Sequence, residues 1–215
     1  MYRMAPFMRR FGRAKLVISL FCLCLLIAVG SALSPQLTTP VSANDSRITI
    51  GTTNKPRTLD PADAYETGSL GLIYNMSDRL YTYKVGSTEI EPQLATALPK
   101  ISADGLTYTM PIRQGVVFHD GTPFNAKAMA FSLERFIKNG GKPDFLLGDI
   151  VESATATGEY ELTIKLKKQF AAFPSLLAFA GVCAVSPKAY EIGEGKFTPN
   201  VFIGTGPYKL VNFAT

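Results

Sequence analysis

Residues 161–167 (Glu-Leu-Thr-Ile-Lys-Leu-Lys) alternate strictly between polar and apolar side chains. Successive side chains of a strand point to opposite faces of its sheet, so this segment predicts a strand with one buried and one solvated face. Shorter strands are expected at 88–91, 107–112 and 116–118. Tight-turn residues separate them: Gly86, Asp104-Gly105, Gly115 and Asp120-Gly121. Turns at such short intervals predict a small antiparallel sheet.

Other segments predict helices and further strands. Residues 68–81 read as a helix, in which Leu70, Ile73, Tyr74 and Leu80 form a buried stripe opposite Asp78 and Arg79. Asn125 is a good N-cap for a second helix, whose stripe is Met129, Leu133, Phe136 and Ile137. A short helix is expected near Pro174, and a helical turn at 187–192. Further strands are expected at 47–52, at 182–185, where the strand should be buried, and at 208–211, which gives an α/β (α+β) fold with a mixed sheet.

The N-terminus reads as a signal peptide over residues 1–43. Five Arg and Lys residues precede the apolar run 16–29, which Ser19 alone interrupts. About 20 apolar residues are needed to span a bilayer as a helix, so this shorter run favours a cleaved secretory signal over an uncleaved membrane anchor. Small residues at 41–43 suit cleavage. A periplasmic location is therefore expected.

Charge and cysteine content exclude other classes. All 17 Asp and Glu residues, and all but five of the 22 Lys and Arg residues, lie beyond residue 43, so the exported part is formally neutral. A nucleic-acid binder needs a basic face, so no nucleic-acid partner is expected. Cys22 and Cys24 would leave with the signal, and Cys183, in an apolar stretch, is expected to be a buried small hydrophobe.

No enzyme, metal site or cofactor is expected. His119 is the sole histidine, whereas a metal site needs several ligands and a hydrolytic triad needs an acid and a nucleophile beside its His. The segment 119–121 (His-Asp-Gly) reads more simply as a turn, in which Asp120 binds main chain and Gly121 permits positive φ. No Gly-x-Ser-x-Gly, Cys-x-x-Cys or phosphate loop is present.

Five ordered motifs resemble one known family, the bacterial extracellular solute-binding proteins of the dipeptide- and oligopeptide-binding type (family 5). The longest is residues 115–124 (Gly-Val-Val-Phe-His-Asp-Gly-Thr-Pro-Phe), followed by Phe131-Ser132. The others are Leu59-Asp60-Pro61, Pro92-Gln93-Leu94-Ala95, Asp104-Gly105-Leu106-Thr107-Tyr108 and Gly204-Thr205-Gly206-Pro207-Tyr208. Lys127 departs from the family, which usually has an acidic residue there.

The resemblance implies a periplasmic-binding-protein-like fold (type II, cluster C), of which residues 44–215 would form an incomplete first lobe without the second. It implies a core sheet from 44–75 and 182–215, with an inserted subdomain at about 76–181. It further implies a monomeric binding component of an ABC importer, which takes peptides in the periplasm and delivers them to the membrane permease. A nickel chelate, haem, opine or sugar as the solute, and a non-functional product of a split gene, remain alternatives.

The residues expected to contact the solute are Thr53, Asn54 and Lys55, in the loop after the first expected strand, and Tyr65. Loops at strand ends border clefts in such sheets; an ordinary solvated loop is the alternative. Residues 204–207 (Gly204, Thr205, Gly206 and Pro207) are assigned to a hinge, because the glycines permit conformations that other residues resist and Pro207 stiffens the exit. A plain tight turn is the alternative.

Overall fold

The computed structural model of the chain describes residues 47–214. The expected signal peptide lies outside the described residues. The architecture below is that of the unit formed by residues 51–215. Within the described part, no helix is long and apolar enough to cross a membrane.

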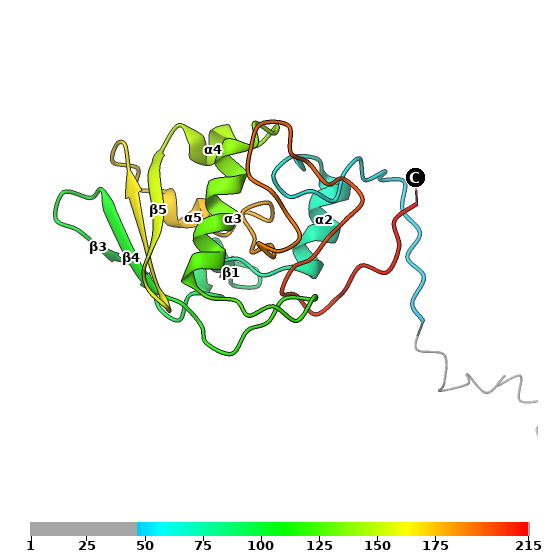
Figure 1. Cartoon of the computed structure of the whole chain (residues 1–215), viewed down its shortest axis with the longest axis horizontal. Helices are drawn as coiled ribbons and strands as arrows, with labels where there is room; N and C mark the ends of the chain where they lie inside the picture. The colour runs from blue at the N-terminus through cyan, green and yellow to red at the C-terminus, as the bar shows by residue number, and fades with distance from the viewer. Residues whose placement is uncertain (1–46, 215) are drawn as a thin grey trace, which may run out of the picture. The chain divides into compact units, whose positions relative to one another are not determined.

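A four-stranded antiparallel sheet forms one end of this unit (Figure 1). Its strands, in spatial order, are β3 (Lys100–Ile101), β4 (Thr107–Pro111), β6 (Glu161–Leu166) and β5 (Val151–Gly158). Alternate residues of the central strands are almost fully buried: Tyr108, Met110, Leu162, Ile164 and Leu166. The sequence-based predictions of a strand near 161–167 and of an antiparallel sheet that contains 107–112 are therefore confirmed. The strand expected at 88–91 lies instead in a separate two-stranded sheet, as residues 90–92.

Helix α3 (Ala126–Lys138) covers the buried face of this sheet. Asn125 caps it as expected, because its side-chain oxygen accepts a hydrogen bond of 3.1 Å from the amide of Ala128. Met129, Leu133 and Phe136 of the expected stripe are buried. The core is completed by residues around two short helices, α4 (Phe145–Gly148) and α5 (Phe173–Leu176), the second of which begins near Pro174 as predicted.

Helix α2 (Thr67–Met76) is shorter than the sequence suggested. The expected helix 68–81 stops at Ser77, which is extended, and Tyr81 already begins the small sheet of β1 (Tyr81–Tyr83) and β2 (Ile90–Pro92). This early end moves Arg79, expected on the solvated face, into the interior with 1% exposure. It leaves Tyr74, expected in the core, 47% exposed.

A second hydrophobic cluster joins segments far apart in the chain. Its buried members come from 59–76 and 183–202: Leu59, Ala64, Ile73, Met76, Cys183, Val185, Tyr190 and Phe202. Both segments belong to the part assigned above to a core sheet, but the division into that part and an inserted subdomain at 76–181 stays a prediction. Every strand described in this structure lies between residues 81 and 166.

Several expected strands are wrong. The segments 47–52, 116–118, 182–185 and 208–211 form no strand, although Val117 and Cys183 each make an isolated antiparallel bridge. A strand requires a hydrogen-bonded neighbour, and apolar alternation alone does not supply one. Residues 182–185 are buried as predicted, whereas Ile48, Ile50 and Val211 are more than four-fifths exposed. Residues 187–189 form a turn, shorter than the helical turn expected at 187–192.

Strand β5 was missed. Its segment, Val-Glu-Ser-Ala-Thr-Ala-Thr-Gly, alternates between small Ala and Thr side chains, which gives a weak apolar signal. Two register irregularities interrupt its pairing with β6. Side chains alternate with a period of two in this segment, but Ala and Thr differ little in hydropathy.

Candidate functional site

The loop expected to contact a solute lies beside the first turn of α2. Thr53, Asn54 and Lys55 are all exposed. A Cβ atom added at Gly68 would lie 3.2 Å from the main-chain carbon of Lys55, so α2 and this loop are in close contact. These three side chains are therefore free to meet a molecule from outside.

Glu66 holds the two arms of this loop together. Its carboxylate accepts hydrogen bonds of 3.1 Å from the amides of Arg57 and Tyr65, and another from the hydroxyl of Ser69. Burial raises the pKa of Glu66, but these hydrogen bonds outweigh it and the net pKa lies below the ordinary value. Arg57 also pairs with Asp63 at 2.6 Å. Contacts of charged side chains thus fix the loop between Arg57 and Glu66.

Tyr65 is 47% exposed at the end of this loop. Its ring packs edge-on against Phe145 at 5.8 Å and Phe179 at 6.2 Å between centroids. The fold therefore places Tyr65, half-exposed, in an aromatic cluster at the surface. No measured contact joins it to Thr53, Asn54 or Lys55, so their joint action stays a prediction.

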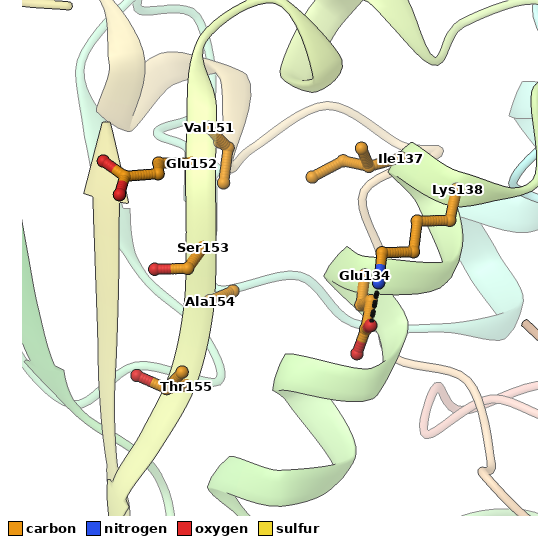
Figure 2. A pocket seen from close by; sticks show the side chains of 8 residues that line it. All are labelled: Glu134, Ile137, Lys138, Val151, Glu152, Ser153, Ala154 and Thr155. Atoms are coloured by element: carbon orange, nitrogen blue, oxygen red, sulfur yellow. Dashed lines mark hydrogen bonds and ion pairs between the residues drawn. The ribbon is translucent and has the colours of Figure 1, made fainter. Parts of the chain in front are cut away.

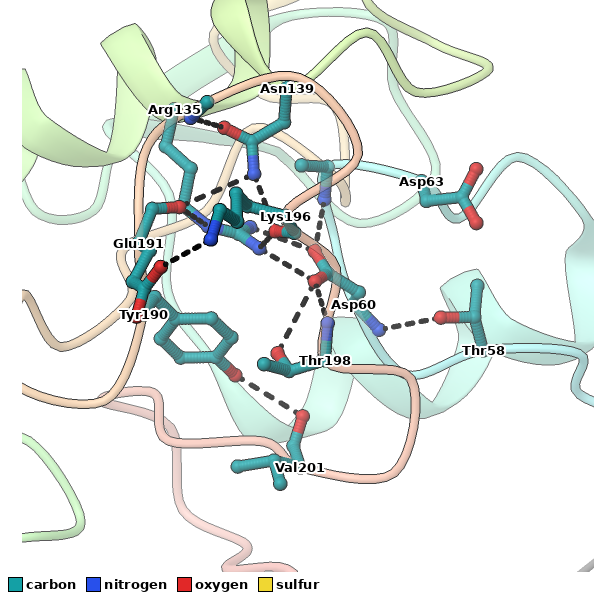
Figure 3. Close-up of polar contacts among 12 residues, drawn as sticks. Thr58, Asp60, Asp63, Arg135, Asn139, Tyr190, Glu191, Lys196, Thr198 and Val201 are labelled. Atoms are coloured by element: carbon teal, nitrogen blue, oxygen red, sulfur yellow. Dashed lines mark hydrogen bonds and ion pairs between the residues drawn. The ribbon is translucent and has the colours of Figure 1, made fainter.

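A buried ion pair lies beneath the same loop (Figure 3). Arg135 of α3 donates to both carboxylate oxygens of Asp60, at 2.7 and 2.6 Å, and both residues are at most 1% exposed. Asp60 also accepts from the amide of Thr198, and Arg135 donates to the carbonyl oxygen atoms of Glu191 and Lys196. The pair therefore ties the loop at 58–63 and the loop at 191–198 to one helix.

The segment expected to be a hinge is packed against the C-terminal end of α2. A Cβ atom at Gly204 would lie 2.5 Å from the carbonyl oxygen of Met76, and one at Gly206 would lie 2.7 Å from the amide nitrogen of Ser77. Neither glycine has positive φ. The prediction that these glycines adopt conformations closed to other residues is thus wrong. They are required because these two segments of the chain pass too closely for any side chain.

Hydrogen bonds hold this segment in place. Thr205 donates its hydroxyl hydrogen to Asp78 at 2.9 Å, and the amide of Gly206 donates to Met76 at 3.0 Å. Nε2 of His119 lies 2.8 Å from the carbonyl oxygen of Gly206, while Nδ1 lies 3.4 Å from the amide of Gly204. Since a carbonyl can only accept, the Nε2 nitrogen carries the proton. His119 is therefore occupied in main-chain contacts.

The turn at 119–121 has the predicted form. Gly121 has φ of +81°, and Asp120 accepts from the amide and hydroxyl of Thr122 at 3.0 and 2.6 Å. Asp120 also accepts from the hydroxyl of Ser186 at 2.7 Å. Burial raises the pKa of Asp120, but the hydrogen bonds from Thr122 and Ser186 outweigh it and lower the net value.

Cys183 is buried, as expected, and burial raises the pKa of its thiol to about 12. A thiol with such a pKa is not a nucleophile near neutral pH. In the part of the chain that the structure describes, no group of three potential metal ligands occurs.

A cavity of about 260 Å³ lies elsewhere, between α3 and β5 (Figure 2). Glu134 and Lys138, which pair at 2.6 Å, line one side, and Ser153 and Thr155 line the other. None of the residues expected to contact a solute lines this cavity. It offers no constellation for catalysis.

Comparison with known proteins gives the family. Residues 89–215 match the profile described as "Bacterial extracellular solute-binding proteins, family 5 Middle". The chain belongs to this family. It is 31% identical to the glutathione-binding protein GsiB of Escherichia coli K12 over 86% of its length, which is 35% of the length of that relative. The chain thus spans about a third of the curated relatives that it matches.

Solved structures show the same fold. The periplasmic binding protein DppA of Helicobacter pylori, in complex with the peptide STSA, superposes with a TM-score of 0.62 at 28% identity, over 73% of this chain and 35% of that one. NikZ of Campylobacter jejuni, in complex with Ni(L-His), gives 0.64 at 26% identity, over 75% and 32%. The periplasmic-binding-protein-like fold class expected from the motifs is therefore confirmed, with the match confined to part of such a protein.

Two buried charges of this structure are not evident from the sequence pattern. Asp60 was noted as part of a motif, but its pairing with Arg135, 75 residues away, was not foreseen. Arg79 was assigned to the surface. Arg135 lies between Leu133 and Phe136 of the expected apolar stripe, which was a usable signal for the first charge, whereas the burial of the second depended on where α2 ends.

Proposed function

We propose that this chain is part of the solute-binding component of an ABC importer, which captures peptides in the periplasm and presents them to the membrane permease. The observation that supports this most is the match to a glutathione-binding protein at 31% identity over 86% of the chain. Glutathione is a tripeptide, and a second similar protein, DppA, is seen with a peptide. Export through residues 1–43 and action as a monomer belong to the same proposal.

Capture needs no reactive group. An extended peptide can be held through its main chain and enclosed when two lobes close about a hinge. In this scheme Thr53, Asn54 and Lys55 supply polar contacts from an exposed loop, and the half-exposed Tyr65 supplies a flat ring. Residues 204–207 act as the hinge in the same scheme, and their close packing against the end of α2 is the contact that must change when the lobes close.

Calorimetry with di- to pentapeptides tests the proposal, with and without any polypeptide that is encoded directly downstream. Lys55→Ala should weaken peptide binding about tenfold, because one charge-assisted contact is lost. Tyr65→Ala should also weaken it. Lys100→Ala, which removes an exposed lysine of the edge strand β3, is the matched control and should bind as the parent does.

Two outcomes would contradict the proposal. If peptides bind but Lys55→Ala and Tyr65→Ala leave the affinity unchanged, the contact residues are wrongly assigned. If no peptide binds in either condition while a chelated metal does, the solute is of another kind; the similarity to NikZ is the observation that favours this second candidate. Decayed coding sequence downstream would favour a non-functional product instead.

A further inference from the structure

Strand β5 forms an open edge of the four-stranded sheet, since its one neighbouring strand in the described residues is β6. In β6, Leu166 donates its amide hydrogen to the carbonyl oxygen of Leu106, on the side away from β5. The main-chain groups of successive residues in a strand point to opposite sides. The residues of β6 that exchange hydrogen bonds with β5 are therefore Thr163 and Lys165.

Ala154 and Ala156 direct their main-chain groups away from the sheet. The register places Thr155 and Ser153 opposite the two bonding residues of β6, and the two alanines alternate with them. Among the residues that the structure describes, no main-chain group from outside the sheet bonds to either alanine. Each alanine therefore presents one N–H donor and one C=O acceptor at the open edge.

The opposite edge of the sheet is protected against further pairing. Strand β3 has two residues, Lys100 and Ile101, and Pro99 directly precedes it. Short edge strands, Lys and Pro are common devices that prevent another strand from adding to a sheet. Strand β5 has eight residues without Pro or Lys, and its two register irregularities leave 153–156 regularly paired. The edge of β5 thus lacks most of the protection that β3 has.

The cavity between α3 and β5 lies beside this open edge, because five successive residues of β5 line it. Figure 2 shows Val151 and Ala154 pointing from β5 toward α3, and Ile137 pointing back toward them. Ile137 and Ala154 are only half-buried, although both pack against the hydrophobic core. The cavity of about 260 Å³ is smaller than the sites of about 300–1,000 Å³ that hold small-molecule ligands, so it suits a single aliphatic side chain.

The charged side chains that line the cavity are all paired within the protein. Glu134 pairs with Lys138 at 2.6 Å, and Glu152 pairs with Lys165 at 3.1 Å. The lining therefore offers no unpaired charge to a charged side chain, and its apolar part is formed by Ile137 and residues of β5. An uncharged occupant is complementary to this groove.

We propose that the edge of β5 and the cavity beside α3 bind an extended, uncharged segment of another polypeptide, which adds to the sheet as a further strand. Its main chain bonds to Ala154 and Ala156, and an aliphatic side chain enters the cavity against Ile137. A second copy of this chain fits less well, because its own β5 would offer the cavity only the methyl groups of these alanines. None of the residues expected to contact a solute lines the cavity, so the inference is independent of the proposed function.

The test is nuclear magnetic resonance of the backbone amides in the whole chain, titrated with the blocked peptide acetyl-Thr-Val-Thr-Val-Thr-amide. The signals of Ala154 and Ala156 should shift saturably, and their amide hydrogens should exchange more slowly in the complex. Methylation of both valine nitrogens removes the donors that face the edge and should weaken binding about tenfold. Alanine in place of both valines should also weaken it about tenfold, because less apolar surface is buried.

Variants test the edge and the cavity separately, with the Ala156 signal as the readout. Ala154→Pro removes an outward donor without breaking a bond to β6 and should weaken binding of the valine peptide about tenfold. Ala154→Leu fills the cavity from within, so the valine and alanine peptides should then bind equally. Ile101→Pro, on the opposite edge, is the matched control and should bind as the parent does. Urea denaturation of each variant checks that the fold is retained.

The proposal is overturned if the signals of Ala154 and Ala156 do not respond to the valine peptide. It is also overturned if the N-methylated peptide binds as tightly as the unmodified one, because its main chain would then not be recognised. Shifts of the same signals that depend on protein concentration alone would assign the edge to a second copy of the chain, and would contradict the proposed occupant.

Discussion

The four-stranded sheet and the segments around α2 both bury apolar side chains, but by different means. The sheet satisfies its main-chain groups in ladders, and its side chains alternate across them. The segments at 58–76 and 183–206 have no ladder, and individual side chains such as Asp60, Arg135 and Asn139 bind their main-chain groups. Because buried main-chain groups must be paired, regions without ladders depend on particular residues.

The largest effect should follow from breaking the buried ion pair. Asp60→Ala or Arg135→Ala leaves the partner charged and unpaired in the interior, which should lower the free energy of unfolding by about 3–5 kcal/mol. Urea denaturation followed by circular dichroism measures this. Glu134→Ala, which removes the exposed Lys138 pair from the same helix, should cost at most about 0.5 kcal/mol. If Glu134→Ala lowered the free energy of unfolding as much as Asp60→Ala or Arg135→Ala does, the buried pair would not be the special support of its region.

The next effect concerns space at the hinge. Gly204→Ala places a Cβ atom 2.5 Å from the carbonyl oxygen of Met76, so the free energy of unfolding should fall by about 1–3 kcal/mol. Gly71→Ala is the control with the opposite expected sign, because Gly71 is exposed and nothing lies within 4 Å of its Cβ position. That change should stabilise the protein by about 0.5–1 kcal/mol. A harmless Gly204→Ala would mean that the segment is looser than its contacts imply.

The same contrast explains what could be predicted from the sequence. The strand at 161–166, the cap at Asn125 and the turn at 119–121 were predicted correctly, because each depends on residues close together in the chain. The strands expected at 47–52 and 208–211 were wrong, because forming a strand depends on a distant neighbour. The end of helix α2 was predicted at the wrong residue for the same reason, since the chain there is bound by the distant residues Thr205 and Gly206.

The candidate site shows the same limit. Exposure of Thr53, Asn54 and Lys55 agrees with a loop, but no sequence pattern could show that Glu66 fastens it. The family motifs marked Asp60 and Gly204 without giving the reason for either. The reasons are long-range contacts, to Arg135 and to Met76, that only the folded chain contains.

A smaller effect tests the region built on the sheet. Asn125→Ala removes the hydrogen bond to the amide of Ala128 and should cost about 1 kcal/mol. Asn125→Asp keeps an oxygen acceptor and places negative charge at the N-terminus of α3, so it should preserve stability. If both variants lose the same amount of stability, the side-chain amide of Asn125 matters for a reason other than capping.

The smallest effect lies where the two regions meet, at Asp120, which accepts from Thr122 on one side and Ser186 on the other. Its pKa in the folded protein is lowered, so the ionised carboxylate stabilises the fold above the ordinary pKa of about 4. This contribution is lost as the pH falls through the lower, folded value.

The stability difference between the parent and Asp120→Asn should therefore be constant near neutral pH and shrink below about pH 4. Urea denaturation at a series of pH values measures it. Thr122→Val removes one donor and should weaken the same pH dependence, because the pKa of Asp120 would return toward its ordinary value. A difference between parent and Asp120→Asn that persists unchanged into acid would show that shape, and not charge, joins the two regions at this residue.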